Sequence, residues 1–235
     1  MSDPIQATSD VAKATEQVAK TTGQLVETTG QLGRFVAKYV AGPLQLTSGI
    51  VQDKLAYMRW ENQIDLIQRA EAKLKAIGLS EPTRTVPPKL AIPLLQAASL
   101  EDDASLRDVW ATLLVNGANA ASGIDLKRAY ISILENLTPF EAVILAKIYA
   151  LPFDQIQHNG AVTGYLPERA AVNQENSLRD ESLPKPTEEV VLALANLARL
   201  GCVTLGRTFG GGEVFDSVTP TTLGRHFVDA CTLQD

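Results

Sequence analysis

A seven-residue repeat fills the first part of this 235-residue chain. From Val11 the sequence reads VAKATEQ, VAKTTGQ, LVETTGQ and LGRFVAK. At about 100° per residue, positions one, two, four and five of each block fall on one side of a helix. That side is mostly Val, Leu, Ala and Thr, whereas the other is mostly charged residues, Gln and Gly. The repeat therefore predicts an amphipathic helix.

The apolar face of this helix is thin, because Thr and Ala dilute it. Glycines 23, 30 and 33 each lower helix stability by about 1 kcal/mol relative to Ala. The helix can dock on its own domain or on a second copy, lie on or insert into a membrane, or belong to a disordered tail. A two-stranded coiled coil is disfavoured, because position four is Ala or Thr in three of the four blocks. The residues that would make the membrane or self-association contact are Val11, Val18, Leu25, Leu32, Phe35 and Tyr39.

Charge and composition indicate an ordinary globular protein rather than a polyanion binder. The net charge is −6, and 45% of the residues are hydrophobic. Residues 1–45 carry four bases and four acids, so lipid binding there would depend on apolar burial and not on anionic headgroups. No apolar run approaches the roughly 18 residues of a membrane-spanning helix. We expect a cytoplasmic protein, with a peripheral position on the inner membrane as the alternative.

Apolar residues at helical spacing predict a helical core between residues 44 and 137. The expected helices run from about Ser48 to Ile77, from Pro87 to Ala98, from a cap at Ser99 to Asn116, and from Asp125 to Leu137. Gly42-Pro43 separates this core from the heptad helix, which we assign to residues 1–43.

The C-terminal hundred residues predict a different unit, assigned to 138–235. Thr138-Pro139-Phe140-Glu141 has the pattern of a capping box. Residues 153–186 are polar and rich in turn formers, which predicts a loop insertion. A helix capped by Thr187, a hairpin with a glycine tip and a last helix from Thr219-Pro220 follow. This order is that of a winged helix, so we expect a mainly α fold with one small β-hairpin.

Several motifs of the core resemble the bacterial Abi-alpha family, named for abortive infection. The motifs are Arg59-Trp60-Glu61-Asn62-Gln63, Pro87-Pro88-Lys89 with Ala97-Ala98-Ser99-Leu100-Glu101, Trp110-Ala111-x-Leu113-Leu114, and Leu137-Thr138-Pro139. The resemblance implies a role in phage defence. It brings no reaction or catalytic residue with it. The Thr- and Gly-rich heptads match no family motif in detail.

The first of these motifs is a candidate interaction site. Five successive helical residues face nearly all directions, so they cannot form one site alone. Trp60 continues the apolar stripe and is expected in the core. Arg59 and Asn62 share a face and could bind a loop backbone or a helix end. Fixing of neighbouring helices is favoured over contact with a partner.

The winged-helix order raises the question of nucleic acid binding. Residues 136–235 carry seven bases and twelve acids, and the helix that would enter the groove begins with Glu188 and Glu189. Phosphate contacts supply most of the affinity of such modules, so this charge disfavours DNA. A protein-interaction or packing role is favoured.

The sequence offers no catalytic, metal or cofactor site. His158, Cys202, His226 and Cys231 lack the spacing of a zinc site. Cys202 lies in an apolar strand and is expected to be an inert thiol, and the pair His226 and Asp229 has no marked nucleophile beside it. We therefore expect a non-enzymatic abortive-infection protein that acts through protein partners or self-association, with its N-terminal helix on or in the membrane. The alternative is a cytoplasmic winged-helix module that regulates or binds nucleic acid.

Overall fold

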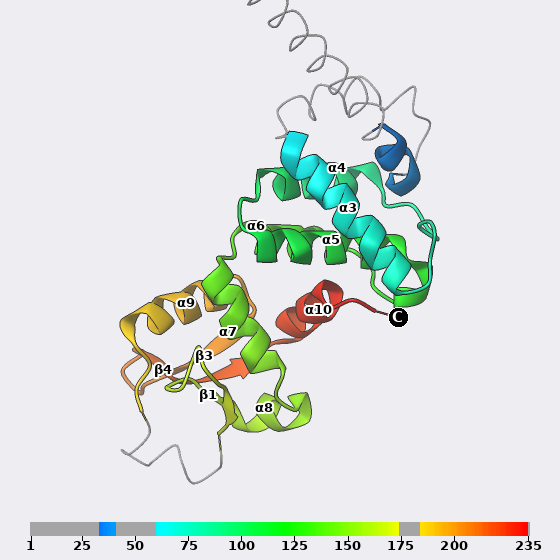
Figure 1. Cartoon of the computed structure of the whole chain (residues 1–235). Helices are drawn as coiled ribbons and strands as arrows, with labels where there is room; N and C mark the ends of the chain where they lie inside the picture. The colour runs from blue at the N-terminus through cyan, green and yellow to red at the C-terminus, as the bar shows by residue number, and fades with distance from the viewer. Residues whose placement is uncertain (1–32, 41–59, 174–183, 235) are drawn as a thin grey trace, which may run out of the picture.

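The computed structural model describes residues 33–40, 60–173 and 184–234. Within these ranges the fold is mainly helical, with a small antiparallel sheet in the C-terminal part, as the sequence predicts. Figure 1 shows two stacked parts: a layer of helices, and a mixed unit that contains the sheet. The last helix lies between them.

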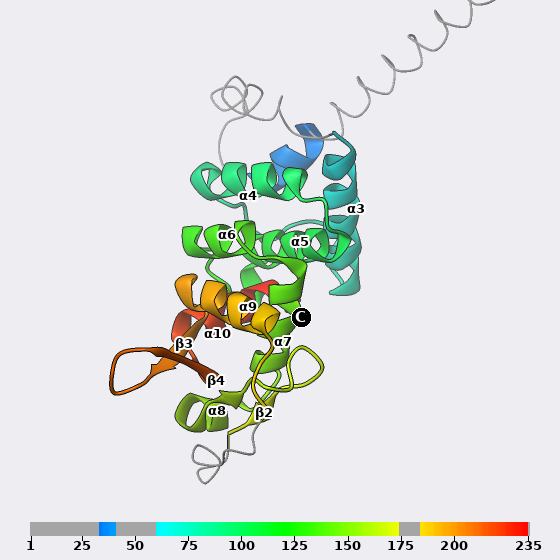
Figure 2. The same ribbon diagram turned by 90° about the vertical axis from the view of Figure 1, so that its left-hand side faces the viewer.

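Four helices and a short 3-10 turn build the first part. They are α3 (Trp60–Ala76), α4 (Pro88–Leu100), α5 (Ala104–Ala118), η1 (Ala120–Ser122) and α6 (Arg128–Glu135). The helix α5 contacts α3, α4, α7 and α10, and its residues from Trp110 to Ala118 are all buried. This enclosure explains why α5 shows little amphipathic patterning. Figure 2 shows α4, α5 and α6 side by side with α3 across one edge.

The second part places four helices around the sheet. Its elements are α7 (Pro139–Tyr149), α8 (Phe153–Asn159), β1 (Ala161–Val162), β2 (Ala171–Val172), α9 (Glu188–Arg199), β3 (Val203–Arg207), β4 (Glu213–Pro220) and α10 (Thr222–Cys231). The strand order is β2-β1-β4-β3, and each neighbouring pair is antiparallel. The long pair β3–β4 is the hairpin that the glycine tip predicts.

The prediction of a loop over residues 153–186 is wrong at its start. That stretch contains α8 and both short strands, and the sheet has four strands instead of a single hairpin. Two-residue strands carry no readable periodicity, because their pairing comes from main-chain partners far along the chain. Val162, for example, pairs with Ser217 of β4.

Helix starts follow the sequence signals with two corrections. The Thr138 capping box forms, and Thr187 caps α9. Ser99, however, is buried inside α4, and Asp103 caps α5 by accepting from the amides of Ser105 and Leu106. Pro220 ends β4, so α10 starts two residues later than Thr219-Pro220 suggests.

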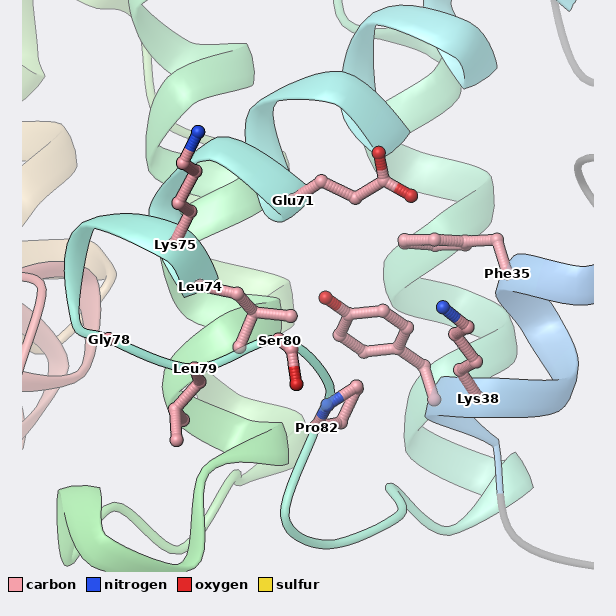
Figure 3. Close-up of a pocket in the computed structure, with 10 residues that line it drawn as sticks. Phe35, Lys38, Glu71, Leu74, Lys75, Gly78, Leu79, Ser80 and Pro82 are labelled. Carbon is pink, nitrogen blue, oxygen red and sulfur yellow. The ribbon is translucent and has the colours of Figure 1, made fainter.

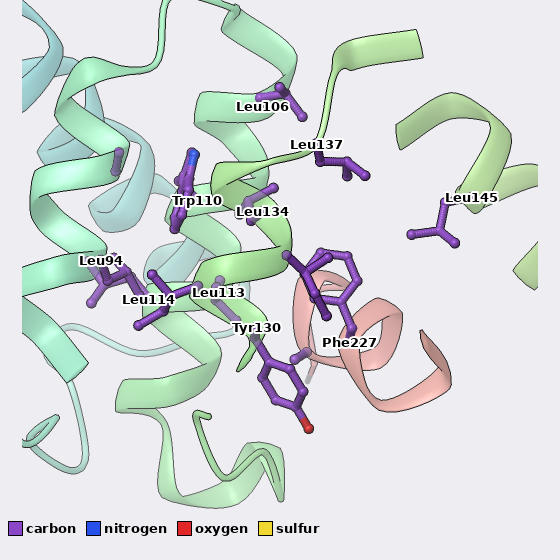
Figure 4. Close-up of a cluster of buried hydrophobic side chains, with 14 of the residues drawn as sticks. Leu94, Leu106, Trp110, Leu113, Leu114, Tyr130, Leu134, Leu137, Leu145 and Phe227 are labelled. Atoms are coloured by element: carbon purple, nitrogen blue, oxygen red, sulfur yellow. The ribbon is translucent and has the colours of Figure 1, made fainter. Parts of the chain in front are cut away.

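One buried apolar cluster runs through both parts of the described chain. Figure 4 shows Trp110, Leu113 and Leu114 of α5 beside Leu134 of α6, with Phe227 of α10 close to Tyr130. The ring centroids of Tyr130 and Phe227 are 6.3 Å apart. The cluster thus includes residues on both sides of the predicted domain boundary at residue 137. The division into two domains stays a prediction.

A buried amide fastens the end of the chain to the helical layer. The side chain of Asn116 donates to the carbonyls of Ala230 (2.9 Å) and Thr232 (2.6 Å) and accepts from the amide of Gln234 (3.2 Å). Asn116 is fully buried, so water does not replace these bonds when they are lost.

We predict that Asn116→Ala lowers the free energy of unfolding by about 2 kcal/mol, because it leaves the buried carbonyl of Ala230 unpaired and removes two part-buried bonds to Thr232 and Gln234. Asn136→Ala is the matched control, since that exposed amide bonds only to the Ser132 carbonyl nearby. Urea unfolding followed by circular dichroism measures both variants. An equal, small effect of the two substitutions would contradict the role of Asn116.

Candidate functional site

The last turns of the predicted amphipathic helix dock on the helical layer. Residues 33–39 are helical, and the side chains of Phe35 and Tyr39 are only 3% and 1% exposed. Their ring centroids lie 4.4 Å apart, at an interplanar angle of 34°. Both residues belong to the predicted apolar face, whereas Gly33, Arg34, Ala37 and Lys38 are exposed. The other four residues of that face, Val11, Val18, Leu25 and Leu32, lie outside the described residues.

Main-chain and charged contacts hold the end of this helix. The amide of Val86 donates to the Tyr39 carbonyl (2.6 Å), and Val40 forms a parallel bridge with Val86. On the surface, Lys38 Nζ lies 3.3 Å from Glu81 Oε1. Because both side chains of that ion pair are exposed, it contributes little. The docking therefore depends on the main-chain pairing with Val86 and on the buried side chains of Phe35, Tyr39 and Val40.

The hydroxyl of Tyr39 is buried without a hydrogen-bond partner in the described part of the chain. Burial, and then the negative charge of Glu71, raise the pKa of Tyr39 well above its usual value. The phenol therefore stays protonated and keeps one unused donor. Such a group costs free energy in the docked state.

A pocket of about 500 Å³ lies beside the docked helix. Figure 3 shows its walls: Phe35 and Lys38 come from helix 33–39, Glu71 and Leu74 from α3, and Ser80 and Pro82 from the loop that follows α3. Lys75, Gly78, Leu79 and Tyr39 complete the lining. The pocket is half open to solvent, and apolar and polar side chains contribute equally to the residues that line it.

Asn62 of the predicted interaction motif fixes neighbouring helices. Its side-chain amide donates to the carbonyls of Ser99 (2.8 Å) and Glu101 (3.1 Å), and its oxygen accepts from Arg107 (2.8 Å). Asn62 thus joins α3 to the end of α4 and to the first turns of α5. Arg59 lies outside the described residues. Trp60 begins α3, and the described part of the chain does not include its side chain.

An ionic network along α3 and α5 continues this contact. Asp65 lies 2.8 Å from Arg69 Nε and 3.0 Å from Arg107 Nε, and Asp108 lies 2.7 Å from Lys73 Nζ. None of these residues is among the sites predicted from the sequence. The spacing of Asp65 and Arg69 by four is a readable signal, but the pairs between helices depend on how α3 crosses α5.

Both cysteine thiols are held in the protonated form, because burial raises the pKa of each, and Cys202 lies near enough to Cys231 to raise the pKa of Cys231 further. Cys202 is buried, and burial raises the pKa of its thiol to about 12, so a thiolate does not form near neutral pH. Asp229 pairs with Arg225 at 3.1 Å. Within residues 33–40, 60–173 and 184–234, no group of three or more His, Cys, Asp or Glu side chains could hold a metal ion. Over the same ranges, no helix is long and apolar enough to cross a membrane.

A family model described as abortive infection alpha matches residues 61–231. The chain belongs to this family. No curated protein and no solved structure matches the chain. The family match covers α3 to α10, so the docked helix 33–39 lies outside it. In this abortive infection alpha protein, one wall of the pocket therefore lies on α3, within the matched residues. The other wall lies on helix 33–39, outside them.

We predict that Tyr39→Phe holds helix 33–39 more tightly on the core, by about 1 kcal/mol, because it removes the unpaired buried hydroxyl and keeps the ring. Phe35→Ala should loosen the helix by about 3 kcal/mol, because it removes a buried ring. Hydrogen exchange of the Val40 amide, which donates to the Val36 carbonyl, measures both effects. A loss of protection in Tyr39→Phe would mean that the hydroxyl has a partner.

Proposed function

We propose that the protein is a non-enzymatic effector of abortive infection whose N-terminal amphipathic helix is kept docked on the core and acts on the inner membrane after release. The observation that carries the proposal is the burial of Phe35 and Tyr39. These two residues continue the apolar face of the heptads, so that face cannot cover the core and enter a membrane at the same time. Release would make it available.

The interactions that dock helix 33–39 are partly offset by unfavourable ones, which suits a helix that undocks under some conditions. Burial of each ring contributes about 2 kcal/mol, whereas the unpaired hydroxyl and the exposed ion pair weaken the docking. A thin apolar face gives a helix of low net hydrophobicity, which is the type that lies in the membrane interface. A modest infection-dependent signal could therefore shift the helix from one surface to the other.

We also propose that the C-terminal unit is winged-helix-like and binds a protein partner or a second copy. The strands β1, β4 and β3 lie in that order, and α9 directly precedes the β3–β4 hairpin, as in a winged helix. Glu188 and Glu189 are exposed at the start of α9, where they would repel a phosphate backbone. This charge argues against the alternative of a nucleic-acid-binding module.

The non-enzymatic assignment is supported by the chemistry of the described side chains. The Cys202 thiol is protonated, and its surroundings are apolar. The exposed His226 lies on α10, and neither of its neighbours in the sequence is a Ser or Cys that could act as a nucleophile. Membrane and protein contact therefore suit the chain better than covalent chemistry, and we place the protein in the cytoplasm with peripheral access to the inner membrane.

A matched pair of double variants tests the membrane step. Leu25→Asp with Leu32→Asp puts two charges on the apolar face, whereas Gln24→Asp with Gln31→Asp adds the same charge on the polar face. We expect the first pair to abolish phage protection in plating assays and dye release from liposomes, since a charge on the buried face of an interfacial helix is costly. The second pair should behave like the wild type.

Liposome assays are run with and without extract from phage-infected cells, so that a signal needed for release is present in one arm. Equal dye release by both double variants, or release by neither them nor the wild type in either arm, would remove the membrane step. Loss of phage protection by both pairs alike would have the same consequence.

A reversible lock tests the docking. Bridge partners lie about 4.8 Å apart, which a disulfide spans, so Val40→Cys with Val86→Cys should form a bond that holds the helix down. We expect the oxidised variant to release dye about tenfold more slowly than the same protein after reduction. Val86→Cys alone, with and without reductant, is the control. Equal rates in the oxidised and reduced lock would show that undocking is not needed.

A further inference from the structure

The tip of the β3–β4 hairpin presents an aromatic ring to solvent. Phe209 lies there and is the most exposed large apolar side chain in the described part of the chain. Figure 2 shows the hairpin projecting from the body of the molecule. A single exposed apolar side chain is common on protein surfaces. Two further features distinguish this one: the way its turn is built, and a groove elsewhere on the same chain.

An ordered turn holds Phe209 in this position. The amide of Gly212 donates to Thr208 Oγ1 (2.9 Å), the amide of Thr208 donates to the Gly212 carbonyl (2.8 Å), and that of Gly211 donates to the Thr208 carbonyl (2.9 Å). Gly211 has a φ of +86°, a conformation that favours glycine. Because three glycines follow Phe209, no side chain on that side of the turn covers its ring. The ring is thus preorganised for insertion, which lowers the entropy lost on binding.

A small apolar groove lies where α7 and α10 approach Val109 of α5. Its volume is about 130 Å³, and it is partly open to solvent. Figure 4 shows three of its side chains, Leu137, Leu145 and Phe227, gathered between α7 and α10. All the lining side chains except that of Thr232 are apolar. The groove therefore contains no charged side chain and suits an apolar group.

The ring and the groove match in size and polarity. An apolar cavity of about 150 Å³ accepts one benzene molecule, so a groove of about 130 Å³ accepts one phenyl ring. Within one chain Phe209 stays in solvent while the groove is open, so the two can meet only between chains. We infer that Phe209 of one copy inserts into this groove of a second copy.

The charge distribution at the tip permits this contact. Arg207 and Glu213 are paired in register at the base of the turn, so the tip is neutral although the chain carries a net charge of −6. No acidic or basic side chain lines the groove. Electrostatic repulsion between the two copies is therefore small where they touch, and the association should depend little on salt.

The contact is heterologous, because a projecting tip on one copy meets a groove on the next. Each pair keeps one free tip and one free groove, so association continues beyond two copies. A phenylalanine buries about 150–250 Å², far below the roughly 1,200 Å² of a stable interface, and we expect weak, reversible association. This inference rests on the proposed binding of a second copy by the C-terminal unit, and it is independent of the membrane step.

Sedimentation velocity of the full chain at about 10 to 500 µM measures the association. We expect Phe209→Ala to weaken it about tenfold or more, because the variant loses the burial of the ring. Leu192→Ala removes another exposed apolar side chain, on α9, and should associate like the wild type.

A second pair of variants tests the groove. Ala146→Glu puts a charge at the exposed lip of the groove on α7 and should also weaken association about tenfold or more. Gln155→Glu adds the same charge on the exposed side of α8 and should have no effect. Circular dichroism checks that each variant is folded.

Mixing the two defective variants gives the sharpest test. Phe209→Ala keeps an intact groove, and Ala146→Glu keeps an intact ring. The mixture should therefore form a one-to-one pair with about the wild-type affinity and stop there, because neither member of the pair has a second working contact. General stickiness of apolar surfaces gives no such rescue.

The inference is wrong if the full chain does not associate, if Phe209→Ala and Leu192→Ala weaken association equally, or if mixing restores nothing. It is also wrong if the wild type stays monomeric and binds liposomes through Phe209, since the ring then enters a lipid surface. Association that persists in both defective variants would move the contact to another surface. That result contradicts this inference and leaves the proposed self-association in place.

Discussion

The enclosure of α5 is the constraint on which the rest of the structure depends. Helices α3, α4, α7 and α10 all contact it, and its residues from Trp110 to Ala118 are buried. This buried second half of α5 leaves no face for water, so the neighbours that pack on it supply mostly apolar surface. Both ends of the described chain join this core: α10 packs on α5, and Phe35 and Tyr39 of helix 33–39 belong to the same buried cluster.

Polar contacts then fix how these neighbours sit. Asn116 binds three backbone groups of the last residues, and Asn62 binds the end of α4 and Arg107 of α5. Close approach adds a further condition at Gly224, where a side chain would collide with the Tyr149 hydroxyl and the Cys202 carbonyl. The helix α10 can therefore approach Tyr149 of α7 and Cys202, the residue before β3, only because position 224 is glycine.

Helix 33–39 is attached to the core differently from the helices around α5. Two rings, the buried Val40 and the main-chain pairing with Val86 hold it, its ion pair is exposed, and the Tyr39 hydroxyl has no hydrogen-bond partner among the described residues. In the proposed function, this short segment is the part that undocks while the family-matched body stays folded.

The amino-acid pattern alone determined the helical class, the capping box at Thr138, the helix cap at Thr187, the glycine-tipped hairpin and the family resemblance. These features depend on spacing within one turn or one hairpin, which a single chain displays. Tertiary structure decided the rest: the strands β1 and β2, the bonds of Asn62 and Asn116, the ionic pairs between α3 and α5, and the pocket. Each of these joins residues that lie far apart in the chain, and no local pattern encodes the distance between them. Phe35 and Tyr39 illustrate both contributions. The heptad pattern puts them on one face of a helix, and only tertiary packing decides that the core covers that face.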